Sequence, residues 1–438
     1  MERRHDIDTL RVAAFATLIL YHVGMVYVDG WGFHVKSQYL LGWVEWPMVL
    51  VNRWRMALLF LLSGIALGLV LPRRTPLQWV RDRSWRLLVP LAAGIAFVVP
   101  IQAYCEARML GTIEPGFLSF LARYLQLRPW PEAGFAGAAY GFTWNHLWYL
   151  PYLWTYTLLA VGGWTLLRHT RATRWPDRLC TRGRWLLWTL PPLWMMATLV
   201  WLDPRYPSTH ALADDWANHA EYLPVFVIGL LVARKDAFWD ALVRLRWRLA
   251  WLALGGATVY MGLRVAGRVL PPGVSTGLSP ETWWLVSRAA HALYWWTALM
   301  ALLAWGKVLL ARPRRWLPYA REAVFPWYVL HQSLTVAAAY GLAAWRLGPV
   351  VEPLLVLGIT LGGCAVLHEF VVRRTPWLRP LFGLPGIRRN TPPGAAIAPY
   401  GRGAGGGSYR DLPGWMTAPR REGMPPDTSV QTARRSSP

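Results

Sequence analysis

The first apolar stretch of the chain contains three ionisable residues, Asp8, Arg11 and His22. An α-helix turns about 100° per residue, so Arg11 and His22 return to within roughly 20° of one face, about 16 Å apart along the axis. Asp8 shares that face and can pair with Arg11. Because the ordinary pKa of histidine lies near neutrality, His22 is a candidate general base. A histidine that only packs against a hydrogen-bond partner would fit the same spacing.

Polar residues also interrupt other apolar stretches. Such groups are costly in lipid and usually face a partner or a water-filled cavity. They therefore predict a polar chamber inside a helical bundle. Gly64 and Gly68 form a small-xxx-small pair, which favours close helix packing. The polar candidates are Arg53, Arg55, His146, Trp148, Arg288, His291, His331 and Gln332.

These polar side chains are carried by stretches that we predict to be membrane helices. Of the 438 residues, 55% are hydrophobic and only 16% are charged, whereas soluble proteins carry about 25% charged residues. The apolar residues form blocks near the roughly 20 residues that a spanning helix needs. We predict an all-α polytopic bundle embedded in a lipid bilayer. Its ten predicted spans are residues 9–29, 46–71, 85–104, 147–167, 185–202, 219–233, 247–268, 283–306, 323–345 and 350–372.

The basic residues predict the orientation. The formal net charge is +23, which in a soluble protein would indicate nucleic acid. With both termini in the cytoplasm, the inner segments hold 34 of the 46 basic residues and the outer segments hold eight. This asymmetry matches the rule that cytoplasmic loops are basic, so no nucleic-acid partner is needed.

Two regions follow from composition. Residues 1–375 form the predicted transmembrane domain, and residues 376–438 a cytoplasmic tail rich in Gly, Pro and Arg. Such a tail cannot bury an apolar core, so we expect it to be disordered. The three cysteines lie far apart and have no metal-type spacing, and we predict no metal.

An inner connecting segment, residues 73–86, contains five arginines. Arginine binds phosphate in a bidentate manner, so this segment could grip the phosphates of a nucleotide-like carrier. Arg83 and Arg86 enter the next span on one face and are the better candidates. The segment could equally serve only to orient the chain.

Several motifs in combination resemble the acyltransferase 3 family of membrane proteins. The first helix of that family has Arg, ten residues and then His, as Arg11 and His22 do. Later signatures of the family are resembled, in the same order, by residues 55–64, 81–90, 145–154 and 325–332. The resemblance covers about residues 6–372 and leaves out the tail.

The resemblance implies an O-acyltransferase that takes an acyl group from cytoplasmic acyl-CoA to a hydroxyl of an extracytoplasmic carbohydrate. It implies that His22 abstracts the hydroxyl proton or briefly carries the acyl group. Arg11, with Asp8 beside it, would complete the catalytic stripe, and Arg83 and Arg86 would bind the CoA phosphates. The implied substrate contacts are His34, Arg55, His146, Trp148 and His331.

Within the family, residues 33–37 and 146–150 resemble a branch associated with succinylation of periplasmic glucans. The implied acyl group is acetyl or succinyl, the acceptor a periplasmic or cell-surface glycan, and the location a bacterial inner membrane. A transporter or flippase for an anionic or lipid-linked substrate would use the same intramembrane charges, but no inverted repeat is evident. A membrane scaffold would leave the His22 and Arg11 stripe without a purpose.

Overall fold

In the computed structural model the described residues are 3–130, 134–170, 177, 180–181, 184–269 and 278–386. This part of the chain is helical, and its β-structure is one isolated parallel bridge between Val28 and Leu41. The all-α class is therefore confirmed. The tail from residue 387 onward lies outside the described residues, and so do most of residues 171–183.

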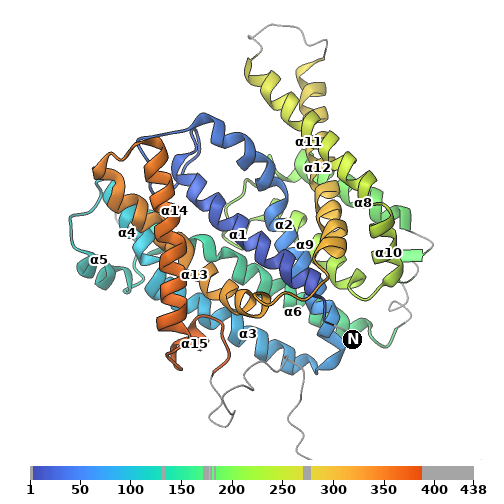
Figure 1. The fold of residues 1–438 in the computed structure, drawn as a ribbon, viewed down its shortest axis with the longest axis horizontal. Coiled ribbons are helices and arrows are strands. Elements are labelled where there is room, and N and C mark those ends of the chain that lie inside the picture. The colour runs from blue at the N-terminus through green and yellow to red at the C-terminus, as the bar shows by residue number, and fades with distance from the viewer. Residues whose placement is uncertain are drawn as a thin grey trace, which may run out of the picture. The chain divides into compact units, whose positions relative to one another are not determined.

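The helices run from α1 near the N-terminus to α15 (Figure 1). The α-helices are α1 (His5–Tyr27), α2 (Glu45–Val70), α3 (Pro76–Ala93), α4 (Pro100–Met109), α5 (Phe117–Tyr124), α6 (Tyr149–Leu167), α8 (Arg184–Ala197), α9 (Trp216–Val232), α10 (Asp236–Arg244), α11 (Arg246–Val269), α12 (Pro280–Leu309), α13 (Leu317–Leu342), α14 (Gly348–Val366) and α15 (Leu378–Leu381). The short 3-10 and π segments are η1 (Gly42–Val44), η2 (Leu71–Arg73), η3 (Gly94–Val98), η4 (Ala138–Tyr140), η5 (Asn145–Trp148), η7 (Thr198–Leu202), η8 (Ala343–Trp345) and η9 (Leu367–Val372).

A helix coincides with each of the ten predicted spans. Seven helical stretches in the described part are long and apolar enough to cross a membrane. α6 and α13 are outside that set, and α9 is a shorter apolar helix. The chain is therefore a multi-pass membrane protein, while the count of ten spans and the orientation stay predictions.

One predicted connecting segment is largely helical. α3 begins at Pro76, so most of residues 73–86 belong to a helix rather than to a loop. The reason is local: the Thr75 side chain accepts from the backbone N–H of Gln78, and the Gln78 side chain accepts from the backbone N–H of Thr75. This capping box, followed by proline at the first helical position, starts the helix there.

α2 forms the centre of the core, and α9 packs tightly along it. Residues 56–62 of α2 are all buried. A β-carbon on Gly64 would lie 2.0 Å from the carbonyl oxygen of Phe226, and one on Gly229 would lie 2.4 Å from that of Leu61. Only glycine permits this approach, as expected for a small-xxx-small contact. The close packing predicted from Gly64 and Gly68 is thus present.

α1 contacts α2, α12, α13 and α14, which gives it a central position (Figure 1). The chain then folds back over the end of α1. Lys36 donates to the carbonyl oxygens of Met25, at 2.9 Å, and of Val28, and Ser37 donates to the buried carboxylate of Glu352 at 2.7 Å. These bonds fix residues 28–41, which carry His34 of the site described next.

Candidate active site

A cavity of about 1030 Å³ is lined by side chains from α1, α2, α9, α12 and α13 and from the connecting segments that contain residues 33–34, 136–148 and 203–214. Its wall combines imidazole, guanidinium, carboxylate and aromatic side chains, as expected for the predicted polar chamber. The predicted site residues that line it are His22, His34, Arg55, His146 and Trp148.

His22 on α1 pairs with His331 on α13. Nδ1 of His22 lies 2.8 Å from Nε2 of His331, and the ring centroids are 5.0 Å apart. The two residues are 309 positions apart in the chain. His331 is fully buried, whereas His22 is partly exposed to the cavity that it lines. The pair therefore consists of an accessible histidine supported by an inaccessible one.

The hydrogen bonds around this pair assign the protons. Nδ1 of His331 lies 3.1 Å from the carbonyl oxygen of Trp327 and 2.8 Å from that of Tyr328. Carbonyl oxygens only accept, so Nδ1 carries the proton and Nε2 of the neutral ring accepts. Nδ1 of His22 must then donate to it, which leaves the lone pair of His22 on Nε2. Among the described residues Nε2 of His22 has no hydrogen-bond partner, so it is available to a group in the cavity.

His146 differs from His22 because both of its ring nitrogens are engaged. Nε2 donates to the carbonyl oxygens of Tyr328 and Val329, each at 3.1 Å, and Nδ1 accepts from the Gln102 amide at 3.2 Å. Its ring centroid lies 5.1 Å from that of His331. His146 is buried. It is suited to positioning its neighbours rather than to exchanging protons.

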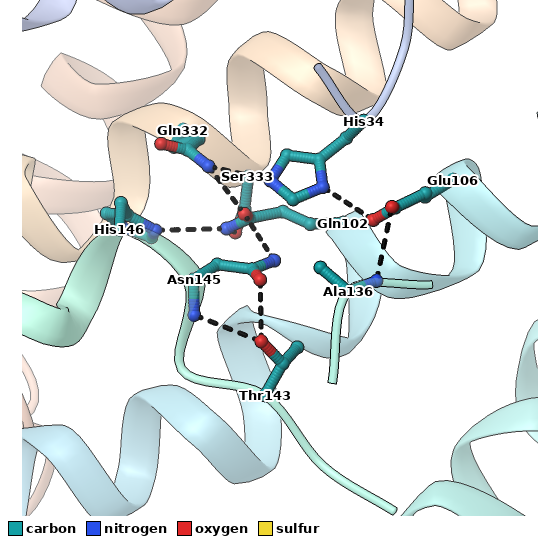
Figure 2. A network of polar contacts seen from close by, with 9 residues as sticks. All are labelled: His34, Gln102, Glu106, Ala136, Thr143, Asn145, His146, Gln332 and Ser333. Carbon is teal, nitrogen blue, oxygen red and sulfur yellow. Dashed lines mark hydrogen bonds and ion pairs between the residues drawn. The ribbon is translucent and has the colours of Figure 1, made fainter. Parts of the chain in front are cut away.

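A polar network joins this region to the predicted outer loops (Figure 2). Glu106 accepts from Nδ1 of His34 at 2.5 Å, and Nε2 of His34 accepts from the Gln332 amide at 3.1 Å. The oxygen of Gln102 accepts from Gln332 and from Asn145, each at 3.0 Å. The donor and acceptor roles agree at every step, so the network holds its members in one arrangement.

Trp148 forms part of the cavity wall, but its ring is largely covered. The His210 ring lies 4.3 Å from it, centroid to centroid, and the Tyr152 ring packs against it edge-on. Only 9% of Trp148 is exposed. Burial lowers the pKa of His210, in the outer connecting segment, below its ordinary value. His210 is thus neutral at pH 7. An open aromatic face comes instead from Tyr140, which lines the cavity and is 73% exposed.

Asp8 and Arg11 lie at the other end of α1. Arg11 is 3.9 Å from Asp8, which confirms the predicted pair, although Arg321 of α13 is closer to Asp8 at 3.2 Å. Arg11 also donates to the carbonyl oxygen of Leu62 at 3.4 Å. In the described part of the chain, neither residue lines the cavity that contains His22.

Arg83 and Arg86 lie on α3, and neither belongs to the cavity wall formed by the described residues. The Arg83 guanidinium lies 5.5 Å from the Trp79 ring centroid, and Arg86 is exposed. Both are therefore placed with the predicted inner segments and not with the imidazole groups.

Sequence reasoning missed Gln102 and Glu106. Both lie on α4, one helical turn apart. Gln102 links His146 to His34 through Gln332, and Glu106 accepts from the other ring nitrogen of His34 (Figure 2). A signal was present, since two polar residues spaced by four positions at the end of an apolar span share a face.

The histidines of the site bond to one another, to amides, to backbone carbonyls and, for His34, to the carboxylate of Glu106. Within the described ranges, no three His, Cys, Asp or Glu side chains gather closely enough to hold a metal ion. The lone pair on Nε2 of His22 can accept a proton from a hydroxyl in the cavity and return it to a leaving group. General acid–base catalysis needs this reversibility.

Comparison with known proteins identifies the family of the chain. The family model described as an acyltransferase domain matches residues 4–369. No curated protein and no solved structure matches the chain. The match extends over most of the sequence and includes α1 to α14, from which the site is built. The chain therefore belongs to the acyltransferase 3 family and is a multi-pass membrane acyltransferase that transfers groups other than aminoacyl groups.

Proposed function

We propose that this enzyme transfers an acyl group, acetyl or succinyl, from acyl-CoA in the cytoplasm to a hydroxyl of a periplasmic or cell-surface glycan. Its location would be the inner membrane of a bacterium. The observation that carries the proposal is Nε2 of His22, an acceptor without a partner among the described residues in a cavity wall, oriented by His331.

In the proposed reaction, Nε2 of His22 takes up one proton and later returns it. The acceptor hydroxyl gives its proton to Nε2 of His22 while its oxygen forms a bond to the thioester carbonyl carbon. The tetrahedral intermediate then collapses, the carbon–sulfur bond breaks, and the thiolate takes the proton from Nε2. His22 ends as it began, and the products are an ester and free CoA.

The donor side is supported by charge. Arg11, Arg83 and Arg86 lie on the side of the molecule where the basic inner segments are predicted, and CoA carries phosphates that arginine binds well. About 16 Å separates Arg11 from His22 along α1. An extended pantetheine arm is long enough to span such a distance, so phosphates held near Arg11 leave the thioester near His22.

The acceptor side is supported by the composition of the cavity wall. Tyr140 and Trp144 come from the predicted outer loop and offer ring faces, on which sugars stack. Carboxylates such as Asp203 and Asp214 can accept from sugar hydroxyls. Residues 33–37 and 146–150 resemble glucans biosynthesis protein C, which supports a glucan as the acceptor.

The test is CoA release by the purified protein. Acetyl-CoA and succinyl-CoA are supplied with a glucan acceptor, and the free thiol is measured. We expect turnover by the wild type and a loss of about 10²–10⁴-fold in His22→Ala. His169→Ala removes an exposed imidazole and should not change the rate. Undiminished turnover in His22→Ala would remove this residue from the mechanism, and vesicle transport without any CoA release would favour a transporter.

A further inference from the structure

Arg55 of α2 has a guanidinium group that is fixed at one edge. Nε and Nη2 donate to the side-chain oxygen of Asn52, at 3.3 and 3.1 Å. The central carbon of the group lies 3.5 Å from the ring centroid of Tyr21 on α1. Two bonds and one stacked ring leave the group little freedom, which is the condition for a pre-organised donor.

The opposite edge of the same group has no protein partner. Nη1 is buried and makes no hydrogen bond within the described part of the chain, and Nη2 keeps a second N–H beyond the one given to Asn52. Arg55 forms no ion pair with any described carboxylate. Arginine stays charged in proteins, so a positive charge with N–H groups that lack a partner among the described residues stands at the wall of the cavity.

Arg55 lies in the same cavity wall as His22, the proposed base. Tyr21, which stacks on Arg55, precedes His22 in α1, and the Tyr21 and His22 rings are 6.1 Å apart, centroid to centroid. For the two side chains to act on a single tetrahedral carbon in this cavity, the hydroxyl must lie about 2.8 Å from the base and the oxyanion about 2.7–3.1 Å from the donor.

The other arginines of the cavity wall are placed differently. Arg288 pairs with Asp203 at 3.0 Å. Arg53 lies two residues from Arg55, on another side of the helix, with its guanidinium carbon 5.6 Å from the Tyr260 ring centroid. Of the three arginines of the cavity wall, Arg55 is the one whose guanidinium stacks on the Tyr21 ring. Arg55 is therefore the cation best placed for charge that develops close to His22.

We propose that Arg55 stabilises the oxyanion of the acyl-transfer reaction. This inference rests on the proposed function. When the acceptor oxygen bonds to the thioester carbon, the carbonyl π electrons move onto the carbonyl oxygen, and Arg55 donates N–H groups to that oxygen. The hydroxyl proton goes to Nε2 of His22. When the carbonyl re-forms, the carbon–sulfur bond breaks and the thiolate takes that proton.

The experiment compares a donor whose acyl group carries a free carboxylate with a donor whose acyl group carries none. Arg55→Met is assayed with acetyl-CoA and with succinyl-CoA at a fixed glucan concentration. We expect kcat to fall by about 10²–10³-fold with both donors, the usual effect of losing an oxyanion donor, while KM changes little. Arg55→Lys keeps the charge but loses the planar fork, so its kcat should lie between those of Arg55→Met and the wild type. Arg205→Met removes an exposed charge and should match the wild type.

Asn52→Ala keeps the Arg55 guanidinium but removes the side-chain oxygen that holds it. This variant therefore tests the role of Arg55 as an oxyanion donor even if Arg55→Met does not fold. We expect kcat to fall by about tenfold and KM to stay the same. A loss confined to succinyl-CoA would overturn the proposal and assign Arg55 to the acyl carboxylate. A change in KM alone, or wild-type kcat in folded variants, would also overturn it. If the wild type releases no CoA, the proposed function fails. If the wild type is active, His22→Ala is inactive and Arg55→Met is unaffected, only this inference is refuted.

Discussion

Replacement of His331 by alanine separates the base from the residue that orients it. His331 is fully buried and does not line the cavity, so it cannot touch a substrate there. Its contribution passes through the bond from Nδ1 of His22 to Nε2 of His331. His331→Ala leaves His22 present but free to rotate and to place its proton on either nitrogen.

The size of the effect follows from one hydrogen bond. A neutral buried hydrogen bond contributes about 1–1.5 kcal/mol, and 1.36 kcal/mol corresponds to a factor of ten in rate. We therefore expect kcat of His331→Ala to fall by roughly tenfold, with KM unchanged. Loss of His22 itself removes the base and should cost about 10²–10⁴-fold.

The matched variant is His331→Gln. A glutamine side chain can place its oxygen near the position of Nε2 and accept from His22, so kcat should stay within about threefold of the wild type. It also fills most of the space, whereas alanine leaves a void that lowers the melting temperature. The assay is CoA release, with the melting temperature recorded for each variant.

A double mutant tests whether His331 acts through His22. If His331 acts through His22, His22→Ala combined with His331→Ala should be no slower than His22→Ala alone. Additive losses would mean that His331 has a separate role. Equal losses in His331→Ala and His331→Gln would show that the accepting atom is not what matters.

Three further predictions concern packing, the polar network and pH. Gly64→Ala forces a β-carbon to within 2.0 Å of a backbone oxygen of α9 and should destabilise the protein by about 1–3 kcal/mol; Gly162→Ala, with open space around its β-carbon, should not lower the melting temperature in detergent. Gln102→Leu leaves buried amide and imidazole groups without their hydrogen-bond partner, which costs about 1–3 kcal/mol for each group. Limited proteolysis should therefore cut the outer loops faster in this variant than in Ser119→Ala, the control at an exposed site. Because burial lowers the pKa of His210, its contribution to stability is complete above the ordinary imidazole pKa and is lost as pH falls through the lowered value. Melting temperatures measured from about pH 7.5 to about pH 5 should therefore fall less in His210→Asn than in the wild type, and parallel curves would contradict this.

The two ends of α1 have separate tasks under the proposed function. Asp8, Arg11 and Arg321 form an ion-pair cluster at one end, while His22 meets the cavity near the other. A helix is a rigid spacer with a rise of about 1.5 Å per residue. It can therefore hold a phosphate-binding cation and a base at a fixed separation, which suits a donor with phosphates at one end and a thioester at the other.

Local features of the sequence were enough to predict the class of the protein and the contents of α1. Hydrophobic block length depends only on which residues follow one another, and each of the ten stretches that it predicted coincides with a helix. Helical periodicity is equally local, and it predicted the Asp8 and Arg11 pair and the small-residue contact at Gly64. The motif spacing was sufficient to identify the family that the comparison confirms.

Which of the candidate residues lie together became visible only when the helices were placed in space. Hydropathy could not show that His331 supports His22 from 309 positions away, or that both nitrogens of His146 are occupied. It also did not predict that Thr75 and Gln78 would start a helix inside an arginine-rich connecting segment. The physical reason is that side-chain contacts between helices depend on how glycine contacts and returning loops set the distances, whereas periodicity describes one helix at a time.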